Sequence, residues 1–287
     1  MAPAPEVIDT IPGIRAAVAA ARADGRSVAL VPTMGALHSG HLSHVERVRE
    51  ADPTAFVIVS IFVNPLQFGA GEDFERYPRT LDADLAKLET VGADAVFAPS
   101  VAEMYPDGGA LVTVSAGKVG GTFEGKSRRG HFDGALTVVA KLLQIVDPDV
   151  ATFGRKDAQQ LWLIERMVRD LDIPVEIHEV GIVREPDGLA MSSRNRYLET
   201  SERLNALALS RALAAARSEA DAGIDAVLAA GQSILSDARG VDVDYFAVVD
   251  ERTFSPVPDG FRGPVIALVA ARVGSTRLID NARFRLG

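Results

Sequence analysis

The sequence predicts an α/β fold, a Rossmann-like doubly wound parallel sheet followed by a smaller C-terminal α+β domain. Short apolar runs such as Val28–Val31 and Ala55–Val63 are typical of strands that are buried on both faces. Each run ends in a turn with proline or glycine, and segments with helical spacing of apolar residues follow. After residue 183 the pattern changes, so we expect domains at 1–183 and 184–287.

The expected elements alternate between strand and helix through the first domain. We expect strands at 28–31, 55–63, 95–98, 149–153 and 174–180, with a short edge strand at 112–115. We expect helices at 13–24, 82–91 and 135–146, and a further helix after Asp157. The second domain is expected to have helices at 201–222 and 224–237 and strands at 243–249, 264–271 and 276–281. Gly274-Ser275 between the last two strands indicates a hairpin.

Composition excludes several classes of protein. The chain of 287 residues has no cysteine, so disulfides, cysteine-ligated metals and cysteine nucleophiles are excluded. Its net charge of −9 argues against a nucleic-acid-binding surface. No apolar run is long enough to span a bilayer, and the N-terminal residues lack the basic flank and apolar core of a signal peptide. We therefore expect a cytoplasmic protein with no membrane or nucleic-acid partner.

The stretch that follows the first buried strand carries most of the chemical signal. Three of the five histidines, His38, His41 and His44, fall within it. His38 and His41 are three residues apart at the expected start of a helix, where side chains share one face. Gly40 between them allows a ligand to approach the backbone, and the unpaired N–H groups of a helix start favour an anion. This stretch predicts a nucleotide phosphate site.

The same residues carry a resemblance to a known family. His38-Ser39-Gly40-His41 resembles the His-x-Gly-His signature of the nucleotidyltransferase superfamily, and Pro32–His38 resembles the pantoate–β-alanine ligase (pantothenate synthetase) family in particular. Further strings agree with that family: Asn64-Pro65-Leu66-Gln67-Phe68, Phe153–Gln160, Met191-Ser192-Ser193-Arg194-Asn195 and Ala271–Asn281. The loop Arg128–Gly134 also matches through Arg128 and His131, although Arg129 stands where the family usually has proline.

The resemblance implies an ATP-dependent reaction in two steps. The carboxylate of pantoate attacks the α-phosphorus of ATP, giving pantoyl adenylate and pyrophosphate, and the amine of β-alanine then displaces AMP to give pantothenate. A carboxylate is ionised at pH 7, so the first step needs alignment and charge neutralisation rather than a general base. His41 and Lys156, with His38 beside the ribose and phosphates, are the expected catalytic residues.

The resemblance also assigns the binding residues. ATP is expected to contact Met34, Gly35, His38, His41, Gly154, Lys156, Asp157, Val183, Met191, Ser192, Ser193 and Arg194. Pantoate is expected to contact Met34, Asn64, Gln67 and Gln160. The amide side chains of the last three both donate and accept hydrogen bonds. Mg²⁺ is expected to accompany ATP, with Asp84 as a candidate protein ligand, although the neighbouring acidic position of relatives is Ala83 here. The family is expected to form homodimers.

Two other functions fit parts of the pattern. One is another small-molecule nucleotidyltransferase, acting on phosphopantetheine or with CTP, although such chains usually lack the strings at 64–68 and 191–195. The other is a non-catalytic nucleotide-binding regulator, which has no need of His38, His41 and Lys156 together. Pyrophosphate release in the presence of a carboxylic acid distinguishes an enzyme from a regulator.

Overall fold

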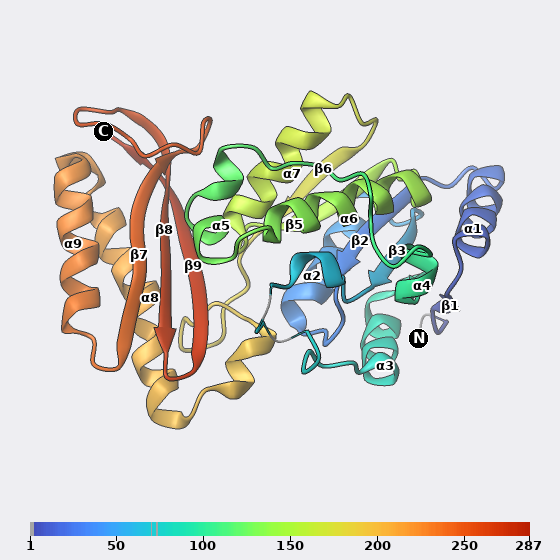
Figure 1. Cartoon of the computed structure of the whole chain (residues 1–287), viewed down its shortest axis with the longest axis horizontal. Helices are drawn as coiled ribbons and strands as arrows, with labels where there is room; N and C mark the ends of the chain where they lie inside the picture. The colour runs from blue at the N-terminus through green and yellow to red at the C-terminus, as the bar shows by residue number, and fades with distance from the viewer. Residues whose placement is uncertain (1–2, 70, 73) are drawn as a thin grey trace. The chain divides into compact units, whose positions relative to one another are not determined.

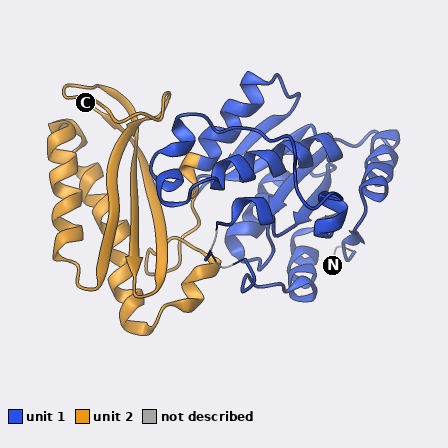
Figure 2. Ribbon diagram, viewed as in Figure 1, with its two compact units in different colours: residues 1–155, 160–181 blue, residues 156–159, 182–287 orange. Residues whose placement is uncertain are grey.

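The computed structural model describes residues 3–69, 71–72 and 74–287, and it confirms the predicted fold class (Figure 1). Residues 1–155 and 160–181 form one compact unit, here called unit 1, and residues 156–159 and 182–287 form unit 2 (Figure 2). Up to residue 181 the elements are β1 (Glu6–Ile8), α1 (Ile11–Ala23), β2 (Val28–Thr33), α2 (Ser39–Ala51), β3 (Phe56–Ile61), η1 (Pro65–Gln67), α3 (Leu81–Val91), β4 (Ala95–Phe97), α4 (Val101–Met104), η2 (Val119–Gly121), α5 (Glu124–Ser127), α6 (His131–Val146), β5 (Val150–Gly154), α7 (Ala158–Asp170) and β6 (Glu176–Val180).

The sheet of unit 1 is parallel and has six strands in the order β1-β4-β3-β2-β5-β6. From β2 the chain therefore adds β3 and β4 on one side, and then returns to add β5 and β6 on the other side of β2. That reversal makes the β2–β5 boundary a topological switch point, where open α/β sheets bind ligands beyond the carboxyl ends of the strands.

The central strands β2 and β3 are mostly apolar because both faces of the sheet are covered there, whereas the edge strand β6 carries Glu176, His178 and Glu179. Val28 and Leu30 of β2 belong to the core formed with α1, α6 and α7, whereas Ala29 and Val31 belong to the core formed with α2 and α3. Successive side chains of a strand point to opposite faces, so a strand between two helical layers cannot alternate with polar residues.

Unit 2 has its own core. Its elements are η3 (Ser193–Tyr197), α8 (Thr200–Ser218), η4 (Ala220–Ala222), α9 (Ile224–Asp237), β7 (Val241–Asp250), β8 (Gly263–Val273) and β9 (Thr276–Leu286). The three strands form an antiparallel sheet in that order, and α8 and α9 pack on it (Figure 1). The hairpin predicted at Gly274-Ser275 joins β8 to β9, and Gly274 has a positive φ of 56°.

Three details differ from the sequence prediction. The edge strand β1 was not expected, because three residues give too little pattern to recognise. Residues 112–115, expected as a strand, are irregular, and Val112 is 88% exposed. Helix α6 begins at His131, four residues before the expected start, because Gly130 with its φ of 80° precedes it.

Among the described residues, none of the helices combines the length and the apolar character needed to cross a membrane.

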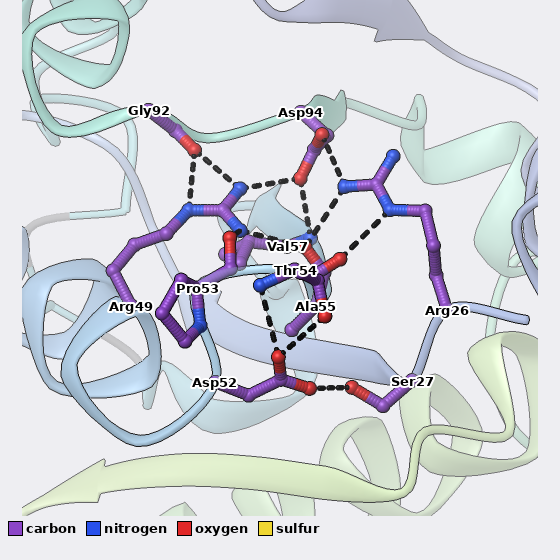
Figure 3. A network of polar contacts seen from close by, with 10 residues as sticks. All are labelled: Arg26, Ser27, Arg49, Asp52, Pro53, Thr54, Ala55, Val57, Gly92 and Asp94. Carbon is purple, nitrogen blue, oxygen red and sulfur yellow. Dashed lines mark hydrogen bonds and ion pairs between the residues drawn. The ribbon is translucent and has the colours of Figure 1, made fainter.

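A polar network joins the amino ends of β3 and β4, at the sheet edge opposite the switch-point site (Figure 3). The carboxylate of Asp94 pairs with Arg26 and Arg49, each at 2.6 Å, and accepts a hydrogen bond from Val57 N at 2.8 Å. Nearby, hydrogen bonds from Ser27 and Thr54 lower the pKa of Asp52 to about 2. Asp94 therefore connects the segment before β2, the end of α2 and the start of β3.

We expect Asp94→Asn to lower the free energy of unfolding of the protein by about 2–3 kcal/mol, the range for a hydrogen-bonded charged group whose partners stay part-buried. Urea unfolding followed by circular dichroism measures this change. Asp107→Asn, in an exposed loop, is the matched control and should change stability by less than about 0.5 kcal/mol. Equal midpoints for the two variants would contradict a stabilising role for the network.

Candidate active site

The predicted nucleotide motif lies at the switch point of the sheet. Residues 34–41 follow β2 directly, Gly154 ends the neighbouring β5, and Asn64–Gln67 follow β3 on the other side of β2. The carboxyl ends of three adjacent parallel strands thus lead into three of the motifs that the sequence singled out. This edge of unit 1 is the candidate active site.

The two signature histidines lie beside each other at the start of α2, with their rings tilted by 35°. His38 is the N-cap residue and His41 lies in the first turn, with ring centroids 4.0 Å apart. The backbone N–H of His38 donates to Nδ1 of His41 at 3.3 Å. Because Nδ1 accepts this bond, the proton of a neutral His41 ring resides on Nε2, which makes Nε2–H the donor for a ligand.

The turn before the histidines has an unusual backbone. Gly35 and Ala36 both have positive φ, 83° and 50°. A Cβ at Gly35 would approach Ile61 Cγ2 at 3.0 Å and Asp84 Oδ2 at 3.3 Å, so glycine is required there by conformation and by space. Asp84 Oδ2 accepts from Ala36 N at 2.9 Å and its Oδ1 accepts from Leu37 N at 2.8 Å.

The predicted pantoate residues Met34, Asn64 and Gln67 form one hydrogen-bonded group. Gln67 Nε2 contacts Met34 Sδ at 3.2 Å, and Gln67 Oε1 accepts from Asn64 Nδ2 at 3.1 Å. Asn64 is 1% exposed, and its oxygen accepts from Tyr105 Oη and Leu66 N. The hydrogen bond from Asn64 therefore fixes the orientation of the Gln67 amide, so that its NH₂ group points to Met34.

The remaining predicted residues lie elsewhere in the chain. Gln160 belongs to α7 in unit 1, whereas Lys156 and Asp157, which follow β5 along the chain, belong to unit 2. The carbonyl of Lys156 accepts from Asn281 Nδ2 at 2.9 Å, so its backbone is anchored to β9.

The motif at 191–195 is a folded turn within unit 2. Met191 N donates to Val183 O at 2.9 Å, which brings the predicted Val183 beside the motif. Ser192 caps η3 by accepting from Arg194 N at 3.3 Å. Asn195 Nδ2 donates to Glu185 Oε1 and Ala190 O. The predicted residues Val183, Met191, Ser192, Ser193 and Arg194 are therefore held in one local group.

Comparison with known proteins decides the family. The model of the family described as pantoate-beta-alanine ligase matches residues 6–283. The chain belongs to the pantoate–β-alanine ligase family. It is 56% identical over 281 residues to the pantothenate synthetase of Leifsonia xyli subsp. xyli, covering 98% of this chain and 97% of the relative.

Solved structures agree with this family assignment. The pantothenate synthetase of Thermus thermophilus superimposes with a TM-score of 0.89 at 47% identity, over 96% of this chain and 98% of that one. The ligase of Francisella tularensis, solved with beta-gamma ATP and beta-alanine, gives a TM-score of 0.76 at 32% identity, over 97% of each chain.

The site of this ligase-family member contains a group that received no role from the sequence. His131 Nδ1 donates to the carbonyl of Gln67 at 2.9 Å, and its Nε2 accepts from Arg128 at 3.0 Å. Glu72 pairs with the same guanidinium at 2.6 Å. Burial alone would raise the pKa of Glu72, but the hydrogen bonds and charge of Arg128 hold that pKa below its usual range. In the sequence, only the match of Arg128 and His131 to the family loop pointed to this group. The structure shows that the group contacts the backbone of Gln67.

His44, the third histidine of the stretch, also lies at this edge. Its Nδ1 is 2.9 Å from Thr152 Oγ1, and a Cβ at Gly154 would lie 3.4 Å from its Nε2. Helix α2 therefore packs against the end of β5 through His44, which contacts Thr152 and lies beside Gly154.

Gly134 makes the closest backbone approach to the predicted pantoate group. A Cβ there would lie 2.1 Å from Leu66 O and 2.7 Å from Gln67 N. We expect Gly134→Ala to displace η1 and to lower kcat/KM for pantoate by about 10- to 100-fold, since small misplacement of a binding group has effects of that size. Steady-state kinetics with varied pantoate measures it.

Gly121→Ala is the matched control for that substitution. Nothing lies within 4 Å of a Cβ at Gly121, and its φ is not positive, so the kinetics should be unchanged. Wild-type pantoate kinetics in Gly134→Ala would show that the position of η1 does not matter for this substrate.

Mg²⁺ does not fit Asp84 in this structure. The side chain is fully buried, and both oxygens already accept hydrogen bonds, from Ala36 N, Leu37 N and Thr80 Oγ1. Within residues 3–69, 71–72 and 74–287, no group of three or more histidines or acidic residues is placed to hold a metal ion. We therefore assign no protein ligand to Mg²⁺.

Proposed function

We propose that this chain joins pantoate to β-alanine with ATP, through a pantoyl-adenylate intermediate, and releases AMP and pyrophosphate. Membership of the ligase family along residues 6–283 supports the substrates. The observation that carries the mechanism is the His38–His41 pair at the switch point, with Gln67 on the neighbouring strand end. A phosphate-binding helix start beside a polar amide suits an adenylate-forming site.

In the first step, a carboxylate oxygen of pantoate forms a bond to the α-phosphorus while the bond to the leaving pyrophosphate breaks. Nε2–H of His41 and the ammonium of Lys156 stabilise the charge on the α-phosphoryl oxygens, and His38 contacts the ribose and phosphates. The nucleophile is already ionised, so no side chain has to remove a proton. Orientation and charge neutralisation account for this step.

In the second step, the amine of β-alanine attacks the carbonyl carbon of the adenylate. The new C–N bond replaces the C–O bond to AMP, and the amine proton passes to water. The intermediate is an activated anhydride, so positioning of the amine is the main requirement. We assign no general base to this step.

The binding roles follow the site groups. Pantoate is held by Gln67, Gln160 and Met34, with Asn64 holding the Gln67 amide in place. ATP is bound by the residues that the family resemblance implies: Met34, Gly35, His38, His41, Gly154, Lys156, Asp157, Val183, Met191, Ser192, Ser193 and Arg194. Serine hydroxyls and backbone N–H groups in the turn at 191–195 suit the β- and γ-phosphates.

Mg²⁺ is proposed only as the companion of ATP, bound to the phosphates. A cytoplasmic location is proposed because the substrates are small charged metabolites and the composition, without cysteine, suits a reducing compartment. A homodimer is proposed from the family. Leu111 and Val112, apolar neighbours that are 94% and 88% exposed, are candidates for its contact surface. Sedimentation of the full chain measures the oligomeric state.

The function is tested by pyrophosphate release from Mg-ATP. We expect release with pantoate alone to stop at about one per site and turnover to begin when β-alanine is added, since the intermediate waits for its amine. No release with pantoate, with or without β-alanine, would contradict the proposal. Release with a different carboxylic acid would indicate another nucleotidyltransferase, and no release with any acid would indicate a regulator.

A further inference from the structure

The turn that leads into the histidine signature is backbone-strained and must be stabilised by its surroundings. Gly35 and Ala36 are consecutive residues in the left-handed region, and alanine rarely adopts a φ of 50°. Such a conformation persists only where neighbouring groups determine it. The residues that fix this turn therefore also fix where His38 and His41 lie.

Asp84, on the first turn of α3, is the group that determines this backbone. Its carboxylate accepts from the two consecutive N–H groups that follow the strained peptide, Ala36 N at 2.9 Å and Leu37 N at 2.8 Å. Both oxygens have a further donor nearby: Thr80 Oγ1 lies 3.1 Å from Oδ2, and Lys87 Nζ lies 3.9 Å from Oδ1. Oδ2 thus accepts two hydrogen bonds and Oδ1 accepts one, and the nearby ammonium of Lys87 disfavours a second cation at Oδ1.

Lys87, one turn further along α3, completes the arrangement. Its Nζ donates to the carbonyl of Leu37 at 2.6 Å. Asp84 and Lys87 thus bind the N–H and the C=O of the same residue, which is 2% exposed and directly precedes His38. Two side chains of α3 therefore set the position at which α2 begins.

We infer that Asp84 is a positioning residue for the histidine signature rather than a metal ligand, because its buried carboxylate holds the Gly35–Leu37 turn in the conformation that presents His38 and His41. The role in catalysis rests on the proposed function, but the role in the turn does not. Asp82 and Ala83, its neighbours in the first turn of α3, are exposed and supply no second carboxylate to this position.

Amide hydrogen exchange of the substrate-free protein tests the role in the turn. In Asp84→Asn one N–H faces an amide NH₂ instead of an oxygen, so we expect the amides of Ala36 and Leu37 to exchange about 10- to 100-fold faster, as for loss of a hydrogen bond to a charged acceptor. The amides of Val28–Val31 should be unchanged. Asp82→Asn, exposed on the same helical turn, is the matched control and should show wild-type exchange throughout.

Kinetics with varied Mg²⁺ separates positioning from metal binding. We expect Asp84→Asn to lower kcat about tenfold or more, with the Mg²⁺ concentration at half-maximal rate and the KM for pantoate both unchanged. A metal ligand predicts the opposite: a raised Mg²⁺ requirement and recovery of the rate at high Mg²⁺. Recovery of that kind, or unchanged exchange at Ala36 and Leu37, would overturn the inference.

A second variant keeps the test decisive if Asp84→Asn fails to fold. Lys87 is 44% exposed, so Lys87→Met should fold while removing the donor to Leu37 O. We expect a several-fold increase in exchange confined to the segment 35–38. Wild-type exchange there would contradict the arrangement. Failure of the pyrophosphate assay would instead contradict the ligase function and leave the exchange result unaffected.

Discussion

Replacing His41 with alanine is expected to lower kcat by about 10²–10³-fold, the scale for losing one preorganised donor to a transition state. The physical reason is the hydrogen bond from His38 N to His41 Nδ1, which leaves Nε2–H as the donor at the start of α2. In the proposed mechanism, this donor stabilises the charge that develops on the α-phosphoryl oxygens. The KM for pantoate should change little, because Asn64 and Gln67 of the predicted pantoate group follow the neighbouring strand β3.

Single-turnover release of pyrophosphate with saturating ATP and pantoate measures the effect on the first step alone. His178→Ala, which removes a histidine from β6, is the control and should retain the wild-type rate. His41→Ala with unchanged release would remove His41 from the mechanism. A large rise in KM for ATP with normal kcat would show that His41 binds ground state and transition state equally.

Replacing Lys156 with alanine is expected to reduce the rate of adenylate formation by a similar factor of about 10²–10³. The turn at 191–195 has serine hydroxyls and backbone N–H groups that suit phosphates, but it has no lysine. Lys156 lies in the motif at 153–160, and its backbone is anchored by Asn281. Its ammonium is therefore expected to supply the positive charge that the turn lacks.

Rapid-quench assays of adenylate formation measure this loss. Lys118→Ala, which removes an exposed lysine of unit 1, is the control for net charge and should be neutral. Lys156→Arg should recover only part of the rate, since a planar guanidinium cannot reproduce a compact ammonium. Full activity in Lys156→Ala would contradict the assignment.

The buried strands of unit 1 could be predicted because their physics is local. Residues 28–31 and 56–59 are apolar on both faces, so composition alone indicates burial between two layers. The three residues of β1 offer no such pattern. Residues 112–115 alternate valine with threonine and serine, which is the period of a strand, yet they are irregular and Val112 is exposed. A short alternating pattern does not determine whether a neighbouring strand pairs with it.

The candidate site was predictable where a residue acts through its own chemistry. His38, His41 and Gln67 follow strands at the carboxyl edge of the sheet, as their motifs indicated. Asp84 was the candidate ligand for Mg²⁺. Only the hydrogen bonds from Ala36 N and Leu37 N show that its carboxylate binds the backbone of the turn instead. Likewise, the contact of His131 with the Gln67 carbonyl joins residues that are 64 positions apart. Such pairings depend on tertiary structure, which spacing in the sequence does not encode.

Isotope transfer from pantoate to AMP tests the central claim most directly. Pantoate labelled with ¹⁸O in both carboxylate oxygens should transfer one ¹⁸O to the phosphate of AMP, because the attacking oxygen stays with phosphorus when the amine displaces AMP. The other ¹⁸O should remain in the amide carbonyl of pantothenate. Mass spectrometry of both products measures this. AMP without ¹⁸O, formed together with pantothenate that keeps its label, would contradict a pantoyl-adenylate intermediate.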